Sequence, residues 1–215
     1  MSNDYSGNGT IGIQAATLSE VTTGGGSTSI LTGSVISQPA TVNLTAEGTL
    51  DWAHWGLASG ASFDHKAGVT HQISDITPLG VAPGSFNASP TYWATHSWSD
   101  GTPTASEAGS SSLAYVEGVG NGFELTVAAD TIPKTLKLYV GAWFATGTLE
   151  ASLSDGSAPA YITSLDNPTD TVSTRIVSID FSAASAGQNL VIRFTLSNDY
   201  SGNGTIAIQA ATLSE

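Results

Sequence analysis

Residues 134–143 read KTLKLYVGAW, and this stretch is the clearest core strand of the sequence. Leu136, Leu138 and Val140 alternate with Lys137 and Tyr139. Because successive side chains of a β-strand point to opposite faces, the three aliphatic residues share one face and the other two share the opposite face. The pattern predicts a strand that contributes its aliphatic face to a hydrophobic core.

Short segments of the same kind follow one another along the chain and are separated by turn residues. The clusters APGS (82–85), SDGTP (99–103) and SDGS (154–157) are typical of turns between strands. Helical periodicity is nearly absent, which excludes an α/β fold and predicts an all-β, antiparallel sandwich of the jelly-roll type. The predicted strands are 29–36, 40–44, 70–76, 92–98, 112–119, 122–128, 134–143, 148–153, 175–181, 189–196 and 205–213.

The two ends of the chain repeat each other. Residues 2–20 read SNDYSGNGTIGIQAATLSE and residues 197–215 read SNDYSGNGTIAIQAATLSE, so they differ only at Gly12 and Ala207, with an offset of 195. The identity indicates that residues 1–20 are the tail of a preceding copy in a tandem array of modules. Two alternatives stay open: a segment added to fill an edge or template assembly, and a natural protein with matching ends.

The duplication predicts the domain organisation and a mode of self-association. We expect a tail strand over 1–20, a Gly/Ser/Thr linker over 21–29 and a β-sandwich module over 30–215. One module has one place for this strand, so a surplus copy favours strand exchange or β-augmentation between chains, although docking on its own domain is the alternative. The predicted self-association residues are Thr10, Ile11, Ile13, Ala15, Leu18, Thr205, Ile206, Ile208, Ala210 and Leu213.

Composition narrows the choice of partners. Hydrophobic residues make up 40% of the 215, enough for a core, and the formal net charge is −13. Five Lys and Arg residues cannot form a nucleic-acid patch, and the sequence holds no apolar run of about 20 residues for a membrane span. No cysteine is present for disulfides. We expect an extracellular or cell-surface location, with any export signal upstream of this sequence.

The C-terminal half resembles galactose-binding-like jelly rolls. The resemblance lies in GFELTV (122–127), LKLYVG (136–141), LEASLSDG (149–156) and the closing NLVIRFTL (189–196) with GTIAIQAATL (204–213). TLDWAHWG (49–56) with FDHK (63–66) is similar to a segment of bacterial extracellular multimodular proteins. The resemblance covers roughly residues 45–215 and implies a jelly-roll repeat of the carbohydrate-binding-module type. Its motifs are structural, so no functional residue is carried over from it.

The aromatic residues between 52 and 98 indicate a candidate glycan site. Sugar rings stack on exposed aromatic planes, while polar side chains bind their hydroxyl groups. The candidate carbohydrate-binding residues are Trp52, Trp55, Tyr92, Trp93, Trp98, Asp64 and His65. The alternative is that these tryptophans pack in the core. Trp52 and Trp55 would face opposite sides of a strand, so we expect at most one of them in the core.

Metal and catalytic motifs are weak. The four histidines match no zinc spacing, and hydrogen-bonding roles are expected for them. An acidic surface leaves a Ca²⁺ site open, with Asp155, Asp166 and Asp170 as tentative ligands, although turn formation explains the same residues. No other cofactor is expected.

The sequence holds no G-x-S-x-G nucleophile motif and no phosphate-binding glycine loop, so we expect no enzyme. The leading hypothesis is an extracellular repeat module of a fibre, stalk or adhesin array, which links to other copies of itself. The alternative is a carbohydrate-binding module, and a glycan-active enzyme domain is the weaker one.

Overall fold

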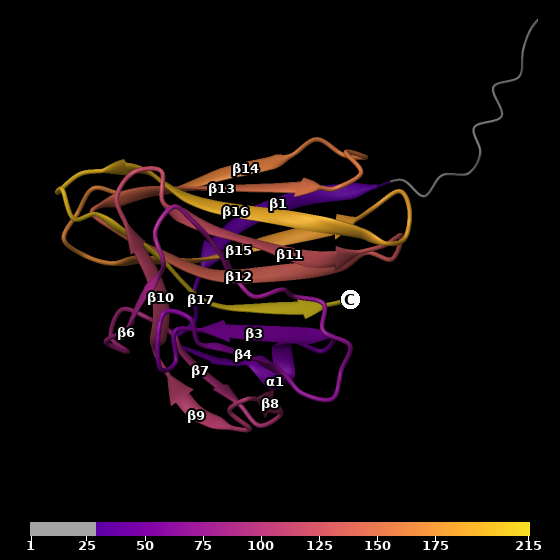
Figure 1. Cartoon of the computed structure of the whole chain (residues 1–215), viewed down its shortest axis with the longest axis horizontal. Helices are drawn as coiled ribbons and strands as arrows, with labels where there is room; N and C mark the ends of the chain where they lie inside the picture. Colours follow the sequence, from indigo (N-terminus) through magenta and orange to yellow (C-terminus); the bar gives the residue numbers. More distant parts are fainter. Residues whose placement is uncertain (1–28) are drawn as a thin grey trace, which may run out of the picture.

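The computed structural model describes residues 29–215, and it confirms the predicted all-β fold. Strands of two large antiparallel sheets face each other, and the one helix in this range is the single turn α1 (Leu44–Glu47) (Figure 1). No helix in this range is long and apolar enough to cross a bilayer. The predicted tail 1–20 and most of the predicted linker 21–29 lie outside the described residues, and with them the candidate residues Thr10, Ile11, Ile13, Ala15 and Leu18.

Within residues 29–215 the strands form three sheets, and all strand pairs are antiparallel except β2 with β7. The main sheet runs in the order β1 (Ile30–Ser37), β15 (Ser173–Ser182), β12 (Lys134–Trp143), β17 (Thr205–Ser214), β3 (Asp51–Trp55), β4 (Phe63–Lys66) and β8 (Gly101–Thr102), and β10 (Ser112–Glu117) joins β17 to β6 (Gly84–Asn87). The second sheet runs β14 (Tyr161–Asn167), β13 (Ala145–Leu153), β16 (Gln188–Asp199), β11 (Gly122–Ala129) and β5 (Thr77–Leu79). A small sheet holds β2 (Thr41–Asn43), β7 (Thr95–Trp98) and β9 (Glu107–Ser110).

The main core lies between the main sheet and the second sheet. Strand β12 runs over the predicted residues, and its Leu136, Leu138 and Val140 are buried in this core. Its opposite face carries Lys137 and Tyr139, which both bind the carboxylate of Glu47 in α1, at 3.0 and 2.8 Å. The predicted alternation of β12 is therefore confirmed, and its polar face is covered by a second layer of structure.

That second layer covers the outer face of the main sheet. The small sheet and α1 pack on β3, β12 and β17 and bury a second apolar cluster, which includes Trp52, Trp98 and Tyr139. Strand β3 is therefore buried on both faces. Gly56 ends it with φ +80°, and a Cβ there would lie 2.1 Å from the backbone of Leu113, so only glycine fits where β3 meets β10.

Strand β17 is an interior strand of the main sheet. One side pairs with β12 from Thr205 to Ser214, and the other side pairs with β10 in its first half and β3 in its second half. The predicted self-association residues Ile206, Ile208, Ala210 and Leu213 are fully or almost fully buried here, and Thr205 is half-buried. The duplicated segment therefore corresponds to a central strand and not to a sheet edge.

Three predicted strands depart most from the structure, and the one predicted over 92–98 begins only at Thr95, after the turn that holds Tyr92 and Trp93. Residues 70–76 form only one isolated bridge, Ile73 to Val127, because buried Asp51 binds the backbone amides of Gln72 and Ile73 at 2.6 and 3.0 Å and diverts them from a ladder. The strand predicted over 40–44 ends at Asn43, whose side chain accepts the Ala46 amide at 3.1 Å and caps α1.

Candidate functional site

All four of the tryptophans that were predicted to bind glycans are buried, Trp93 with 6% of its surface exposed. Three of them lie in the core. Trp52 and Trp55 are fully buried on opposite faces of β3, and Trp98 is buried beside Trp52. Their indole N–H groups bind Asp100 at 2.9 Å, Asp75 at 3.0 Å and the Thr104 carbonyl at 2.9 Å, respectively. The platform predicted from Trp52, Trp55 and Trp98 is therefore wrong. The expectation that at most one of the β3 pair lies in the core fails because both faces of β3 are covered.

The other candidates are scattered. Asp64 is buried, and its carboxylate accepts the Thr104 amide at 2.9 Å. His65 is half-buried against His71, with ring centroids 4.3 Å apart. Tyr92 is 55% exposed, in the turn that leads to Trp93. The structure does not bring these residues together into one site, and only Trp93 belongs to the groove described next.

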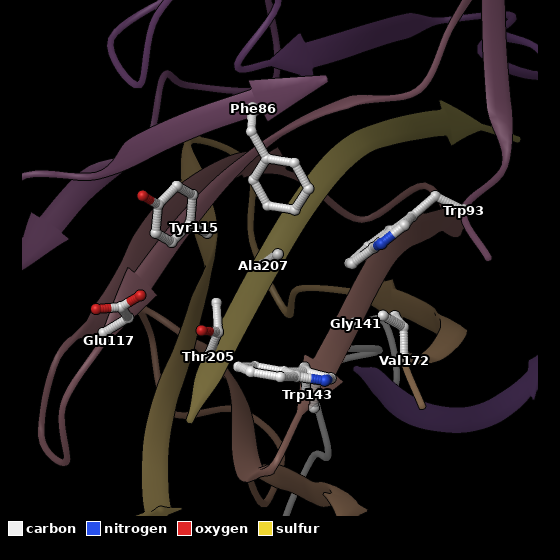
Figure 2. Close-up of a pocket in the computed structure, with 10 residues that line it drawn as sticks. Phe86, Trp93, Tyr115, Glu117, Gly141, Trp143, Val172, Thr205 and Ala207 are labelled. Atoms are coloured by element: carbon white, nitrogen blue, oxygen red, sulfur yellow. The ribbon is translucent and has the colours of Figure 1, made fainter. Parts of the chain in front are cut away.

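An open groove with a volume of about 450 Å³ lies on the outer face of the main sheet, beside the small sheet. Its floor includes Ala207 of β17, and four aromatic side chains surround that residue: Phe86 of β6, Trp93, Tyr115 of β10 and Trp143 of β12 (Figure 2). We call this surface the aromatic groove; Glu117, Gly141, Ala142, Val172 and Thr205 complete it.

Two glycines let aromatic rings lie flat on the strands. The Trp93 ring packs directly against Gly141, because a Cβ at Gly141 would come within 2.2 Å of that ring. Gly84 is the cross-strand partner of Tyr115, and a Cβ at Gly84 would lie 2.7 Å from the Tyr115 ring. Any larger residue at either position would push its aromatic partner off the sheet, so the two glycines set the shape of the groove walls.

Trp143 is held in place from the side. Its indole N–H donates to Asp170, with 3.0 Å to the carbonyl and 3.2 Å to the carboxylate. The next residue, Phe144, has φ +46°, a left-handed conformation that is rare for a bulky side chain. Strand β12 ends here and β13 of the other sheet begins one residue later. The half-buried Trp143 ring is therefore fixed by a side-chain anchor and a sharp backbone turn.

The polar groups of the groove are few. Glu117 is exposed at the end of β10, and within the described part of the chain its carboxylate makes no hydrogen bond. Thr205 is half-buried and donates its hydroxyl to the Asn203 carbonyl at 3.2 Å. No Lys or Arg lines the groove. A mostly apolar concave surface with a few polar groups at its border is the usual form of a small-molecule site.

The three candidate calcium ligands do not form a cluster. Asp166 accepts hydrogen bonds from the hydroxyls of Thr146 and Tyr200, and these bonds lower the pKa of its carboxyl. The pKa of Asp155 is lowered mainly by its hydrogen bond with Ser157, and Asp170 anchors Trp143. Among residues 29–215, no three acidic or histidine side chains form a cluster that could hold a metal ion. The three aspartates therefore act in turns and as anchors.

Two histidines lie in the layer under the small sheet. His54 and His96 are fully buried, 5.7 Å apart between ring centroids, and their ring nitrogens have no hydrogen-bond partner among the described residues. Burial lowers the pKa of His54 to about 3. Burial, and to a smaller extent His54, keeps the pKa of His96 well below its usual value. Both rings are therefore neutral at physiological pH, and the expected hydrogen bonds are not made.

Sequence reasoning missed Phe86, Tyr115, Trp143 and Glu117. One signal was available: in β10 and β12, Tyr115 and Trp143 alternate with residues that face the core. The order of strands that brings β6, β10, β17 and β12 together could not be read from that alternation. The fold and the groove define a β-sandwich protein with an aromatic surface site.

No protein-family model and no curated protein sequence matches this chain. Similar solved structures each cover 66% of it. TmCBM61 in complex with β-1,4-galactotriose is 10% identical, is covered over 87% of its length and gives a TM-score of 0.42. The enzymatically active domain of bacteriophage CBA120 tailspike protein 4 gives 13%, 19% and 0.37, and carbohydrate-binding module CBM36 in complex with calcium and xylotriose gives 7%, 100% and 0.31. These values are low, so the likeness identifies no ligand for this chain.

Proposed function

We propose that the chain is a carbohydrate-binding module and that the aromatic groove is its binding site. The observation that carries the proposal is the arrangement of Phe86, Trp93, Tyr115 and Trp143 around a shallow floor at Ala207 (Figure 2). Phe86 is 47% exposed and adjoins the half-buried Tyr115, with ring centroids 5.6 Å apart, so neighbouring aromatic side chains share the apolar surface here. The exposed Phe86 and the half-buried Tyr115 and Trp143 offer ring surface beside the sheet, and such surface matches the flat, weakly apolar faces of sugar rings.

The size and polarity of the groove fit a sugar. Its volume of about 450 Å³ lies in the usual range for ligand sites, roughly 300–1,000 Å³. The Glu117 carboxylate and the Tyr115 hydroxyl lie at the border, where they could accept and donate hydrogen bonds to sugar hydroxyls. A purely apolar ligand would make no use of these polar groups.

The charges favour a neutral glycan. All five Lys and Arg residues lie in the described range, and four of them are paired elsewhere: Lys66 with Asp100, Lys134 with Asp130, Lys137 with Glu47 and Arg193 with Glu124. None of the five lines the groove. A uronic-acid or sulfated chain would bring negative charge next to Glu117 with no cation to offset it, so an acidic glycan is disfavoured.

A hollow beside the aromatic groove favours binding along the side of a glycan chain over binding at its end. A second hollow of about 440 Å³, between residues 81–84 and 115–117, shares Tyr115 and Glu117 with the aromatic groove. Neighbouring sugar units of one linear chain could lie in the aromatic groove and in this second hollow.

The groove favours binding without catalysis. A glycosidase of the usual kind places two carboxyl groups about 5–10 Å apart on either side of the bond that it cleaves. Glu117 is the one carboxylate that lines the aromatic groove. This supports the proposal of a binding module over that of a glycan-active enzyme.

The test is a fluorescence titration with soluble, neutral β-linked galactan, xylan and glucan oligosaccharides of increasing length. We expect one series to change the tryptophan emission, with affinity rising from disaccharide to longer chains. Trp143→Ala should weaken that binding at least about tenfold, since one stacking face is lost. Tyr92→Ala removes an exposed aromatic outside the aromatic groove and is the matched control.

The Tyr92→Ala control distinguishes the aromatic groove from other exposed aromatic surface. If Tyr92→Ala lowers affinity as much as Trp143→Ala, or if Trp143→Ala leaves it unchanged, the aromatic groove is not the binding site. If no neutral glycan binds and a fatty acid or apolar peptide does, the proposed ligand class is wrong. Glu117→Gln should weaken binding of a neutral glycan only a few-fold, because an amide keeps hydrogen-bonding capacity.

A further inference from the structure

The position of β17 is fully specified by its surroundings. Its backbone pairs on one side with β12, from Thr205↔Trp143 to Ser214↔Thr135, and on the other with β10 and β3. Ile206, Ile208 and Leu213 face the main core, and Gln209 on the opposite face donates to the carbonyls of Ala94 and Ser111 at 3.2 Å. The main sheet therefore has one place for this sequence, which we call the β17 slot.

The chain encodes a second segment that fits the β17 slot. Residues 10–19 read TIGIQAATLS and residues 205–214 read TIAIQAATLS. Every side chain that contacts the core or the small sheet from β17 thus has an identical counterpart: Ile11 for Ile206, Ile13 for Ile208, Gln14 for Gln209 and Leu18 for Leu213. The single difference places Gly12 where Ala207 forms the floor of the aromatic groove.

We propose that the two copies compete for the β17 slot within one chain. In the arrangement that the structure describes, residues 205–214 occupy the slot. In the alternative arrangement residues 10–19 occupy it, with the same partners in β12, β10 and β3, and residues 205–214 are released. The alternative is a circular permutation of the same fold, in which the new strand enters the sheet ahead of β1.

The register of the sheet shows that the connection can close. Ile30 pairs with Ser182 of β15, Phe181 with Lys134 of β12, and Thr135 with Ser214 of β17. The start of β1 and the end of β17 are thus level and three strand spacings apart, about 14 Å at about 4.8 Å per spacing. Figure 1 shows the C-terminus and the start of β1 at the same end of the molecule. Residues 20–29, which would bridge this gap, can span about 33 Å.

The balance between the copies can be estimated. Glycine in place of buried Ala207 removes a methyl group and adds backbone freedom, which disfavours the N-terminal copy roughly threefold. The connection through residues 20–29 is about twice as long as the turn 200–204 that joins β16 to β17, which adds a factor of about three. Together the C-terminal copy is favoured about tenfold, so the alternative arrangement holds about a tenth of the molecules.

The competition gives a defined form to the predicted self-association. Whichever copy is outside the slot offers a complete β17 sequence to another chain whose own copy has left. The predicted residues Thr205, Ile206, Ile208, Ala210 and Leu213, and their counterparts Thr10, Ile11, Ile13, Ala15 and Leu18, are then the strand that is exchanged. A role in a fibre, stalk or array remains a prediction that depends on this exchange.

The test uses proline in the full-length chain. Ile208 pairs with Ala114 on one side and Val140 on the other, so proline there removes a ladder donor and blocks β17. Ile208→Pro should still unfold cooperatively, with its unfolding equilibrium constant raised about tenfold, because residues 10–19 take the slot. Ile13→Pro, at the equivalent position of the tail, is the matched control and should resemble the unchanged chain. The double variant should show no cooperative unfolding.

Thermal and urea unfolding followed by tryptophan fluorescence decide between the outcomes. If Ile208→Pro is as unfolded as the double variant, the tail does not enter the slot and the proposal is overturned. If the double variant is as stable as Ile208→Pro, the proline is tolerated in β17 and the proposal is overturned as well. Light scattering of folded Ile208→Pro in dilute solution should give mainly a monomer; if a dimer is the only folded species, residues 10–19 enter the slot of another chain only, and the single-chain form is overturned. None of these readouts depends on glycan binding.

Discussion

Mild acid should destabilise this protein through the pair His54 and His96. Both rings are fully buried without hydrogen-bond partners among the described residues, and burial lowers both pKa values below 6.5. In the unfolded chain both groups regain a pKa near 6.5 and take up protons below it. A histidine with a depressed pKa in the folded state therefore contributes fully above pH 6.5, and its contribution falls as the pH falls below 6.5.

The size of the effect follows from proton linkage. For each histidine that is neutral in the folded state and charged in the unfolded state, the protein loses about 1.4 kcal/mol of stability per pH unit. From pH 6.5 to pH 5 this amounts to about 2 kcal/mol for His54, and His96 adds a loss of the same sign. The total stability of a domain is about 5–15 kcal/mol, so the loss is large.

Other titratable groups act in a different pH range, or their contribution can be separated from that of His54 and His96. The lowered pKa values of Asp100 and Asp130 matter only below the ordinary carboxyl range, near pH 4 and lower. His71 also has a lowered pKa, caused first by burial and opposed by nearby Asp51, so the unchanged chain includes its contribution. A variant that lacks only the buried pair isolates the term of interest.

The assay is urea unfolding at pH 7.5, 6.5, 5.5 and 5.0 for the unchanged chain and for His54→Leu, His96→Leu and the double variant. Because no hydrogen bond is lost and leucine has a similar volume, the variants should keep their stability at pH 7.5. At pH 5 His54→Leu should be about 2 kcal/mol more stable than the unchanged chain, and the double variant should be more stable than either single variant. Parallel pH profiles for the unchanged and double-variant proteins would refute the reasoning, as would NMR shifts showing either ring protonated at pH 5.5 in the folded state.

Two further substitutions test the supports of the fold and the groove. Asp51→Asn should cost about 3 kcal/mol in urea unfolding and expose residues 67–76 to limited proteolysis, because the buried carboxylate accepts the amides of Gln72 and Ile73 and a bond from His71 at 3.0 Å; unchanged proteolysis would contradict this. Gly141→Ala should displace Trp93, cost about 1–3 kcal/mol and lower glycan affinity several-fold; a crystal structure with Trp93 unmoved would contradict it.

The alternating pattern of β12 was sufficient to predict its bounds and its core face, because one face is aliphatic and the other carries Lys137. It was not sufficient for β3. Asp51–Trp55 shows no alternation of buried and exposed residues, because the small sheet covers the face of β3 that a simple sandwich would leave exposed to solvent. A local pattern records which faces are apolar, and it does not record which distant strands cover them.

The same reason explains the error over the glycan residues. An aromatic cluster in the sequence marks either a surface or a core, and the partner of the indole N–H decides between them. For Trp52 and Trp55 those partners are Asp100 and Asp75, which lie 48 and 20 residues away. Trp143 was not a candidate because it lies 45 residues beyond the aromatic cluster at 52–98, and its aromatic neighbours in the groove come from β6, β10 and the turn before β7.

Double coverage also bears on the duplicated strand. An edge strand has a partner strand on one side only, so an extra copy of it could add to a sheet without displacing any strand. β17 is buried on both faces and paired on both sides, so an extra copy gains its full set of contacts only by replacing the resident one. The duplication therefore predicts exchange and not addition. Augmentation of an intact module by the tail, with β17 still in place, would contradict this step even if the chain were found to associate.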